Sequence, residues 1–327
     1  MRNVEIPKNA IAKRTLLWGA ALALVLGMIA LPSQAPAQDT NSSGGVPVRM
    51  VVTVKAHNGG NPPAMAANDV QVFQRGKSAR VASFVPLQGD RAGLQLYILI
   101  DETSRDSISV QFHAISDFIK EQPASTAIGI GYMRNGMAVE VQGLTTDRAL
   151  VTKALRLPLG ASVGYTSPYL ALTDLMKKWP VTEDRREIVM ITSGIDPLGG
   201  GFASNPFVNP YFDEAVDHAQ KGGFIVYAIY APGGGFAGRF GPRNLAQTGL
   251  DVYAQRTGGQ AYNLYLGNPV DLTPYLQDIN YDLKHQYELT YLAPSAKKPG
   301  LEPVKVKTEM SNATLIHAEE GYVGTGL

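Results

Sequence analysis

Hydrophobic residues follow two different patterns along the chain. β-branched runs separated by turn residues predict three antiparallel strands over 48–54, 70–73 and 81–85. From Leu94 onward the runs become almost continuously apolar, as in parallel strands buried on both faces. They predict strands over 94–100, 127–132, 187–192 and 224–230, with an edge strand over 137–141 and a short strand over 260–262.

Helical spacing fills the intervals between these later strands. It predicts helices over 108–119, 147–155, 168–179, 212–221, 244–257 and 270–284. Strands that alternate with helices at this spacing indicate an α/β fold, a doubly wound and mostly parallel sheet of the Rossmann-like kind. Ligands of such sheets bind beyond the carboxyl ends of the strands. We call the loops at this edge the top face.

The strand pattern returns after His285, over 286–292, 304–310 and 314–318. Three strands in about forty residues bury too little surface to be stable alone. We therefore expect the two chain ends to pair in one small β-sandwich-like unit, built from residues 48–92 and 286–323 around an α/β domain over 93–285.

The first residues have the features of a targeting segment. Four bases and one acid lie in residues 1–14, the sixteen residues Leu16 to Leu31 carry no charge, and Ala35-Pro36-Ala37 follows. This order predicts a signal peptide over 1–37, cleaved after Ala37, and a linker over 38–47. The chain is then secreted or periplasmic, without a membrane span after cleavage. The alternative is a retained anchor, although a spanning helix needs about 20 apolar residues.

Composition excludes several classes of function. The 29 Lys and Arg residues balance 28 Asp and Glu residues, so no steering toward nucleic acid is expected. The absence of cysteine excludes disulfides, thiolate zinc sites and cysteine nucleophiles. The five histidines are scattered, and Ser193 lacks the G-x-S-x-G turn of a serine hydrolase. We expect a protein that is not an enzyme.

Four stretches resemble a known family: Leu96 to Arg105, Gly164 to Leu172, Ile188 to Asp196, and Gln286 to Tyr291 with Glu319 to Tyr322. Over about 46–323 the chain resembles von Willebrand factor type A (VWA) domains, in particular the secreted VWFA-related Acidobacterial domain family. The resemblance implies the same α/β fold and, on its top face, a metal-ion-dependent adhesion site.

The residues of that implied metal site are only partly present. The family motif is Asp-x-Ser-x-Ser, followed by a Thr from a second loop and an Asp from a third. Asp101 and Thr166 match it, and Thr103 replaces the first serine with another hydroxyl. Arg105 and Ser193 replace the second serine and the second aspartate. Because Mg²⁺ and Mn²⁺ prefer carboxylate-rich oxygen shells, we expect no bound cofactor. Asp196, three residues beyond Ser193, is the residue that could complete the site.

Arg105 suggests two readings of the degenerate site. Its guanidinium could bind a carboxylate of a partner bidentately, without metal. Alternatively, it pairs with Asp101 or Glu102 and only fills the former metal site.

Two glycine-rich loops over 197–210 and 232–243 are expected on the same face. The second carries Phe236, Arg239 and Arg243 and no acid, and aromatic and arginine side chains dominate contact energies at interfaces. The plain alternative is a pair of mobile linkers. We therefore expect an adhesion-type protein-binding module that takes an acidic or carboxylate-bearing partner; the alternative is a structural or assembly factor of the cell envelope with an inert top face.

Overall fold

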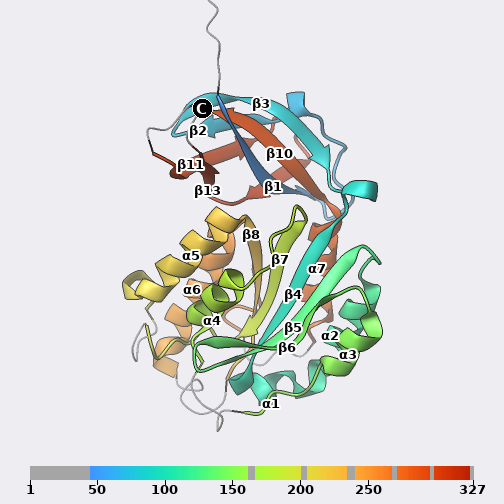
Figure 1. The fold of residues 1–327 in the computed structure, drawn as a ribbon, viewed down its shortest axis with the longest axis vertical. Coiled ribbons are helices and arrows are strands. Elements are labelled where there is room, and N and C mark those ends of the chain that lie inside the picture. Colours follow the sequence, from blue (N-terminus) through green and yellow to red (C-terminus); the bar gives the residue numbers. More distant parts are fainter. Residues whose placement is uncertain are drawn as a thin grey trace, which may run out of the picture. The chain divides into compact units, whose positions relative to one another are not determined.

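Two sheets contain the strands of this protein (Figure 1). The computed structural model describes residues 45–160, 166–199, 205–233, 240–266, 271–294 and 298–324. The expected signal peptide over 1–37 and the first residues of the linker lie outside this range. The first strand begins at Val46, inside the segment 38–47 that the sequence suggests as linker.

The first sheet is the α/β sheet that the apolar runs predict. Its strand order is β6-β5-β4-β7-β8-β9, and all neighbours are parallel except the edge strand β6, which is antiparallel to β5. The strands are β4 (Leu94–Asp101), β5 (Thr126–Arg134), β6 (Met137–Thr145), β7 (Arg185–Thr192), β8 (Phe224–Tyr230) and β9 (Ala261–Tyr262). Every residue of β8 is buried, because helices cover both faces of the sheet.

Three helices cover each face of this sheet. The helices are α1 (Arg105–Ile108), α2 (Phe112–Glu121), α3 (Arg148–Ala154), α4 (Pro168–Lys177), α5 (Pro210–Gly222), α6 (Phe240–Arg256) and α7 (Thr273–Lys284). One apolar core joins α2, α3 and α7 to the sheet, and a second joins α4, α5 and α6 to the opposite face. The prediction of a doubly wound α/β fold is confirmed.

The single helix expected over 108–119 is wrong in detail. The chain forms α1, a 3-10 turn over Ser109–Gln111, and then α2. The turn brings the buried side chain of Gln111 to the backbone N–H of Leu272, which donates to it at 3.1 Å. The spacing of hydrophobic residues along the helix does not reveal this long-range contact.

The second sheet is built from both chain ends, as the sequence predicts, but it is one curled sheet rather than a sandwich. Its order is β12-β1-β10-β3-β2-β11-β13, all antiparallel. The strands are β1 (Val46–Ala56), β2 (Gln71–Gln74), β3 (Lys77–Pro86), β10 (Gln286–Ala293), β11 (Gly300–Lys307), β12 (Ala313–His317) and β13 (Glu320–Val323). A methyl group on Gly321 of β13 would lie 3.3 Å from Val48 of β1, so the sheet curls until these non-neighbouring strands meet.

Buried polar contacts join the second sheet to the amino ends of the parallel strands. Arg185, the first residue of β7, donates to the carbonyl oxygens of Ala92 and Leu283 and to the side chain of Gln286 on β10. Lys55 of β1 contacts two carboxylates of α7, and we return to this junction in the Discussion. The carboxyl ends of the parallel strands therefore lie at the opposite edge, away from the junction (Figure 1).

None of the described helices is long and apolar enough to cross a membrane.

Candidate functional site

Asp101 is the centre of the top face. It ends β4 and caps the 3-10 helix Glu102–Ser104, so its side chain is fixed at the carboxyl edge of the sheet. One carboxylate oxygen accepts hydrogen bonds from the backbone N–H and the hydroxyl of Thr103, at 2.8 and 2.7 Å. The other accepts from the hydroxyls of Thr192 at 2.8 Å and Thr166 at 3.3 Å. Three loops thus supply hydroxyls to one carboxylate.

Burial dominates the electrostatics of this carboxylate. Asp101 is fully buried, which raises its pKa above the ordinary value, although the hydrogen bonds from Thr103, Thr192 and the Ser193 backbone oppose the shift. These donors take the place of the hydration that the group has lost. Asp101 is therefore a structural acceptor that holds the three loops together.

Asp196 does not turn toward Asp101. One of its carboxylate oxygens accepts from the hydroxyl of Ser167 and the side-chain amide of Asn209, both at 2.9 Å. The other accepts from the backbone N–H groups of Leu198 and Gly199, both at 3.0 Å. Asp196 is buried in this set of donors, so it is engaged in ordering the loop after β7.

These residues do not fit a hydrated Mg²⁺ or Mn²⁺ ion. Magnesium keeps several of its waters and is bound through carboxylates that face them. Asp101, Thr103, Thr166 and Ser193 are all buried, and both oxygens of the one carboxylate already accept two donors each. No cluster of three or more acidic, histidine or cysteine side chains that could hold a metal occurs in the described part of the chain.

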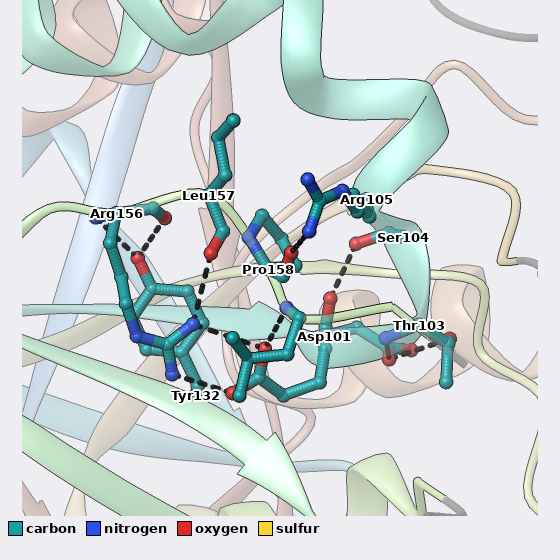
Figure 2. A network of polar contacts seen from close by, with 10 residues as sticks. Asp101, Thr103, Ser104, Arg105, Tyr132, Arg156, Leu157 and Pro158 are labelled. Atoms are coloured by element: carbon teal, nitrogen blue, oxygen red, sulfur yellow. Dashed lines mark hydrogen bonds and ion pairs between the residues drawn. The ribbon is translucent and has the colours of Figure 1, made fainter. Parts of the chain in front are cut away.

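Glu102 is held by a different arginine from the one the sequence suggests. Figure 2 shows Arg156 folded over the ring of Tyr132, with the guanidinium carbon 3.8 Å from the ring centroid. Its two terminal nitrogens donate to the two carboxylate oxygens of Glu102 at 2.6 and 3.2 Å. The Leu159 backbone N–H donates to Glu102 at 2.6 Å as well. This bidentate pair fixes the loop after α3 against the end of β4.

Arg105 is left exposed as a result. Its guanidinium donates to the carbonyl oxygen of Pro158 at 3.4 Å and points away from Asp101 (Figure 2). The reading in which Arg105 pairs with Asp101 or Glu102 is wrong, because hydroxyls saturate the first and Arg156 occupies the second. A cation consequently faces solvent beside the degenerate metal motif.

Apolar side chains are unusually exposed on the same face. The described chain has thirteen exposed large hydrophobic residues. Seven of them lie in the segments that follow the parallel strands β4, β5, β7 and β9, and two more lie in the loop between α3 and α4, whose Leu159 backbone N–H donates to Glu102. Phe207 and Val208 are the clearest pair, with 66% and 69% of their surface accessible. The nine are Val110, Met137, Leu157, Leu159, Leu198, Phe207, Val208, Tyr265 and Leu266. Exposed apolar side chains at the sheet edge where ligands of such folds bind make this face a candidate interaction surface.

The remaining sequence predictions have mixed outcomes. The structure brings Asp101, Thr103 and Thr166 together and places the Ser193 backbone beside them. Arg243 lies in α6 and not in a loop, since that helix begins at Phe240. Phe236 and Arg239 lie outside the described residues.

Sequence reasoning missed several side chains that build the site. Thr192 is one of them, although its position directly before Ser193 at a strand end was a usable signal. No such signal marks Asn209 or Arg156, because Asn209 reaches Asp196 and Arg156 reaches Glu102 from a separate loop.

No family model matches the chain, and no curated protein matches it in sequence. Several solved structures align with part of the chain at low sequence identity. An aerotolerance-related membrane protein from Bacteroides fragilis aligns with 58% of this chain and 98% of its own at 18% identity, with a TM-score of 0.42. BatB from Bacteroides thetaiotaomicron aligns with 59% of this chain and 100% of its own at 16% identity and a TM-score of 0.41.

The SpRpn10 VWA domain gives 12% identity over 57% of this chain and 94% of its own, with a TM-score of 0.37. These sequence identities and TM-scores are too low to assign a role to any residue of this chain. The α/β fold stands on the strand order and helix placement described above. Membership of the Acidobacterial family stays a prediction.

Proposed function

We propose that this chain is a secreted or periplasmic, non-enzymatic binding module that holds a protein partner on its top face without a divalent metal. The observation that carries the proposal is the set of nine exposed hydrophobic residues around the carboxyl ends of the parallel strands. Interfaces are built from apolar anchors inside a polar rim. The top face supplies both, since Arg105 and Asp106 are exposed among these residues.

The chemistry of the partner follows from Arg105. Its guanidinium is exposed, and among the described residues it makes one hydrogen bond, of 3.4 Å to Pro158, which leaves donors available for a carboxylate. We therefore propose a partner segment that combines an acidic side chain with apolar neighbours. Metal does not enter this recognition, because Asp101 is saturated by hydroxyl and backbone donors.

The test compares two charge-reversal variants in the presence of a chelator. A partner captured from the cell envelope fraction is purified and titrated against wild type, Arg105→Glu and Arg91→Glu. Arg91 is also exposed but lies near the junction of the two sheets, so it is the matched control. We expect EDTA to leave the affinity unchanged and Arg105→Glu to weaken it at least about tenfold, as for a truncated interface charge pair.

A second pair of variants tests the apolar part of the surface. Phe207→Ser with Val208→Ser should weaken binding, whereas Val181→Ser should not, because Val181 is fully exposed outside the top face. Loss of affinity on chelation, or equal effects of Arg105→Glu and Arg91→Glu, would contradict the proposal.

The alternative role is a structural or assembly factor of the cell envelope. One observation favours it: β12 lies at an edge of the antiparallel sheet and pairs only with β1 among the described strands. An edge strand can add a strand of another chain. In that case substitutions on β12 would abolish assembly, and Arg105→Glu or Arg243→Glu would leave it intact.

A further inference from the structure

A cavity of about 480 Å³ lies beside the edge strand β6, away from the top-face residues described above. Its walls come from Tyr97 of β4, Leu144 of β6 and Leu175 of α4, and from Trp179 just after that helix. This volume falls in the range of small-molecule sites, which are mostly apolar and carry few polar groups. The cavity therefore has the size and lining of a ligand site.

Two glycines of β5 allow Tyr97 to form one wall. Its ring lies across Gly129 and Gly131, where a methyl group on Gly129 would sit 2.5 Å from the ring carbons. The phenol then reaches β6, and its hydroxyl donates to the Glu140 carboxylate at 3.4 Å. The Gly-Ile-Gly sequence of this strand is thus explained by the position of the tyrosine ring.

The edge strand is irregular at the same place. The pairing of β6 with β5 shifts register twice. On β5 the shifts lie between Ile128 and Ile130 and between Ile130 and Gly131. Bulges of this kind redirect side chains and are common beside functional sites. Here they flank Glu140, Gly143 and Leu144, which all line the cavity.

The charge of the cavity is negative in effect. Its two charged lining groups are Glu140 and Lys178. The ammonium of Lys178 is paired with Asp174 at 2.8 Å. Among the described residues, the exposed carboxylate of Glu140 accepts one hydrogen bond, the long one from Tyr97 at 3.4 Å. Trp179 is held in place because its indole N–H donates to Gln95 at 2.6 Å and its ring packs edge-on against Phe224. A fixed indole and a carboxylate that line the same cavity are suited to a cation.

We propose that this cavity binds a small organic cation, an ammonium group with an apolar body. The ring of Trp179 supplies cation–π attraction, Glu140 supplies the counter-charge, and the leucine side chains cover the apolar part. The proposal is independent of the top-face function, because it uses none of the same residues.

Choline is the probe, and its neutral carbon isostere, dimethylbutanol, has the same shape without the charge. The full chain carries Trp18→Phe, which leaves Trp179 as the sole tryptophan reporter. Fluorescence titrations are made at constant ionic strength on this protein and on two further variants. Glu140→Gln removes the charge but keeps an acceptor for Tyr97, and Glu183→Gln removes an acid that is 96% exposed at another site.

We expect choline to give a saturable change in the millimolar range, as its few heavy atoms imply. Choline should bind the reporter protein about fivefold more tightly than the neutral isostere does. Choline should also bind the reporter protein about fivefold more tightly than it binds the Glu140→Gln protein. Glu183→Gln should bind choline as the reporter protein does.

Three results would each overturn the proposal: no saturable change with choline, equal affinity for choline and its isostere, or unchanged choline affinity in Glu140→Gln. The comparison of choline with its isostere needs no variant in the cavity, so it stands even if Glu140→Gln folds poorly.

Discussion

Replacing Glu187 with glutamine should stabilise this protein at neutral and alkaline pH. Glu187 lies on β7 at the junction of the two sheets and is fully buried. Neither of its carboxylate oxygens has a well-formed hydrogen bond among the described residues. Arg185, Gln286 and Tyr227 lie near enough to lower its pKa, but burial outweighs them and raises it to about 7.

The size of this stability change follows from proton linkage. A pKa that rises from 4.5 to about 7 on folding means that the folded state binds more protons than the unfolded state between these values. Stability from this group is fully present below pH 4.5 and is lost as the pH rises to about 7, after which it stays constant. At 1.36 kcal/mol for each pKa unit, the loss is at most about 3 kcal/mol.

A second acid of the junction acts in the same direction. Asp282 of α7 has a pKa raised to about 7 by burial, against the opposing effect of Lys55 at 3.0 Å. The negative charge of Glu187 raises this pKa further, so the two groups titrate as a coupled pair. Asp278, Tyr262 and Tyr227 also face Asp282 or Lys55, and the side chain of Gln260 accepts a hydrogen bond from Lys55. Glu187→Gln should therefore also ease the ionisation of Asp282.

The assay is urea unfolding followed by circular dichroism at pH 5, 6, 7 and 8 for wild type, Glu187→Gln and Glu183→Gln. We expect wild type to lose stability as the pH rises and Glu187→Gln to lose less, since only Asp282 still titrates there, so that the variant is more stable by up to about 3 kcal/mol at pH 8. Glu183 is exposed and provides the control. The reasoning fails if Glu187→Gln has the same pH slope as wild type, or if it is equally destabilised at pH 5 and pH 8.

Three further predictions concern the metal motif, the Glu102 pair and β5. Calorimetry with Mg²⁺ or Mn²⁺ should give no binding heat, and EDTA should not change the melting temperature; micromolar binding would refute our account of Asp101. Arg156→Ala should destabilise the fold by about 2–3 kcal/mol in urea unfolding, since it leaves the buried Glu102 unpaired, and adding Glu102→Gln should restore part of this loss; additive effects would argue against the pairing. Gly129→Ala should cost about 2 kcal/mol, because its methyl group would collide with the ring of Tyr97, and the cost should fall in a Tyr97→Ala background.

The fold was predictable because buried parallel strands leave a direct trace in the sequence. The apolar runs of β4, β7 and β8 are continuous, and their regular alternation with helices admits few other architectures. The short β13 was not expected as a strand, and β11 was expected too late in the chain. Both errors have one cause: β13 pairs only with β11, and their register depends on a sheet that curls through strands far apart in sequence.

The candidate site was predictable only in its centre. Asp101, Thr103 and Thr166 could be placed together because each stands where a strand ends or a helix begins, and parallel strands end at one edge. The partner of Glu102 could not be found this way. Arg156 is 54 residues away on a loop after α3, and nothing local distinguishes it from Arg105, which lies three residues from Glu102 and points elsewhere.

Ser193 stands where the resemblance to VWA domains implies an aspartate, and this bears on the geometry of the top face. With Ser193 in that position, Asp101 is the single carboxylate among the hydroxyls, and a buried carboxylate must find donors. The hydroxyls of Thr103, Thr166 and Thr192 turn toward it, so the groups that could have offered lone pairs to a metal instead donate protons to Asp101. These hydrogen bonds tie the three loops to one carboxylate, and the guanidinium of Arg105 is exposed beside them.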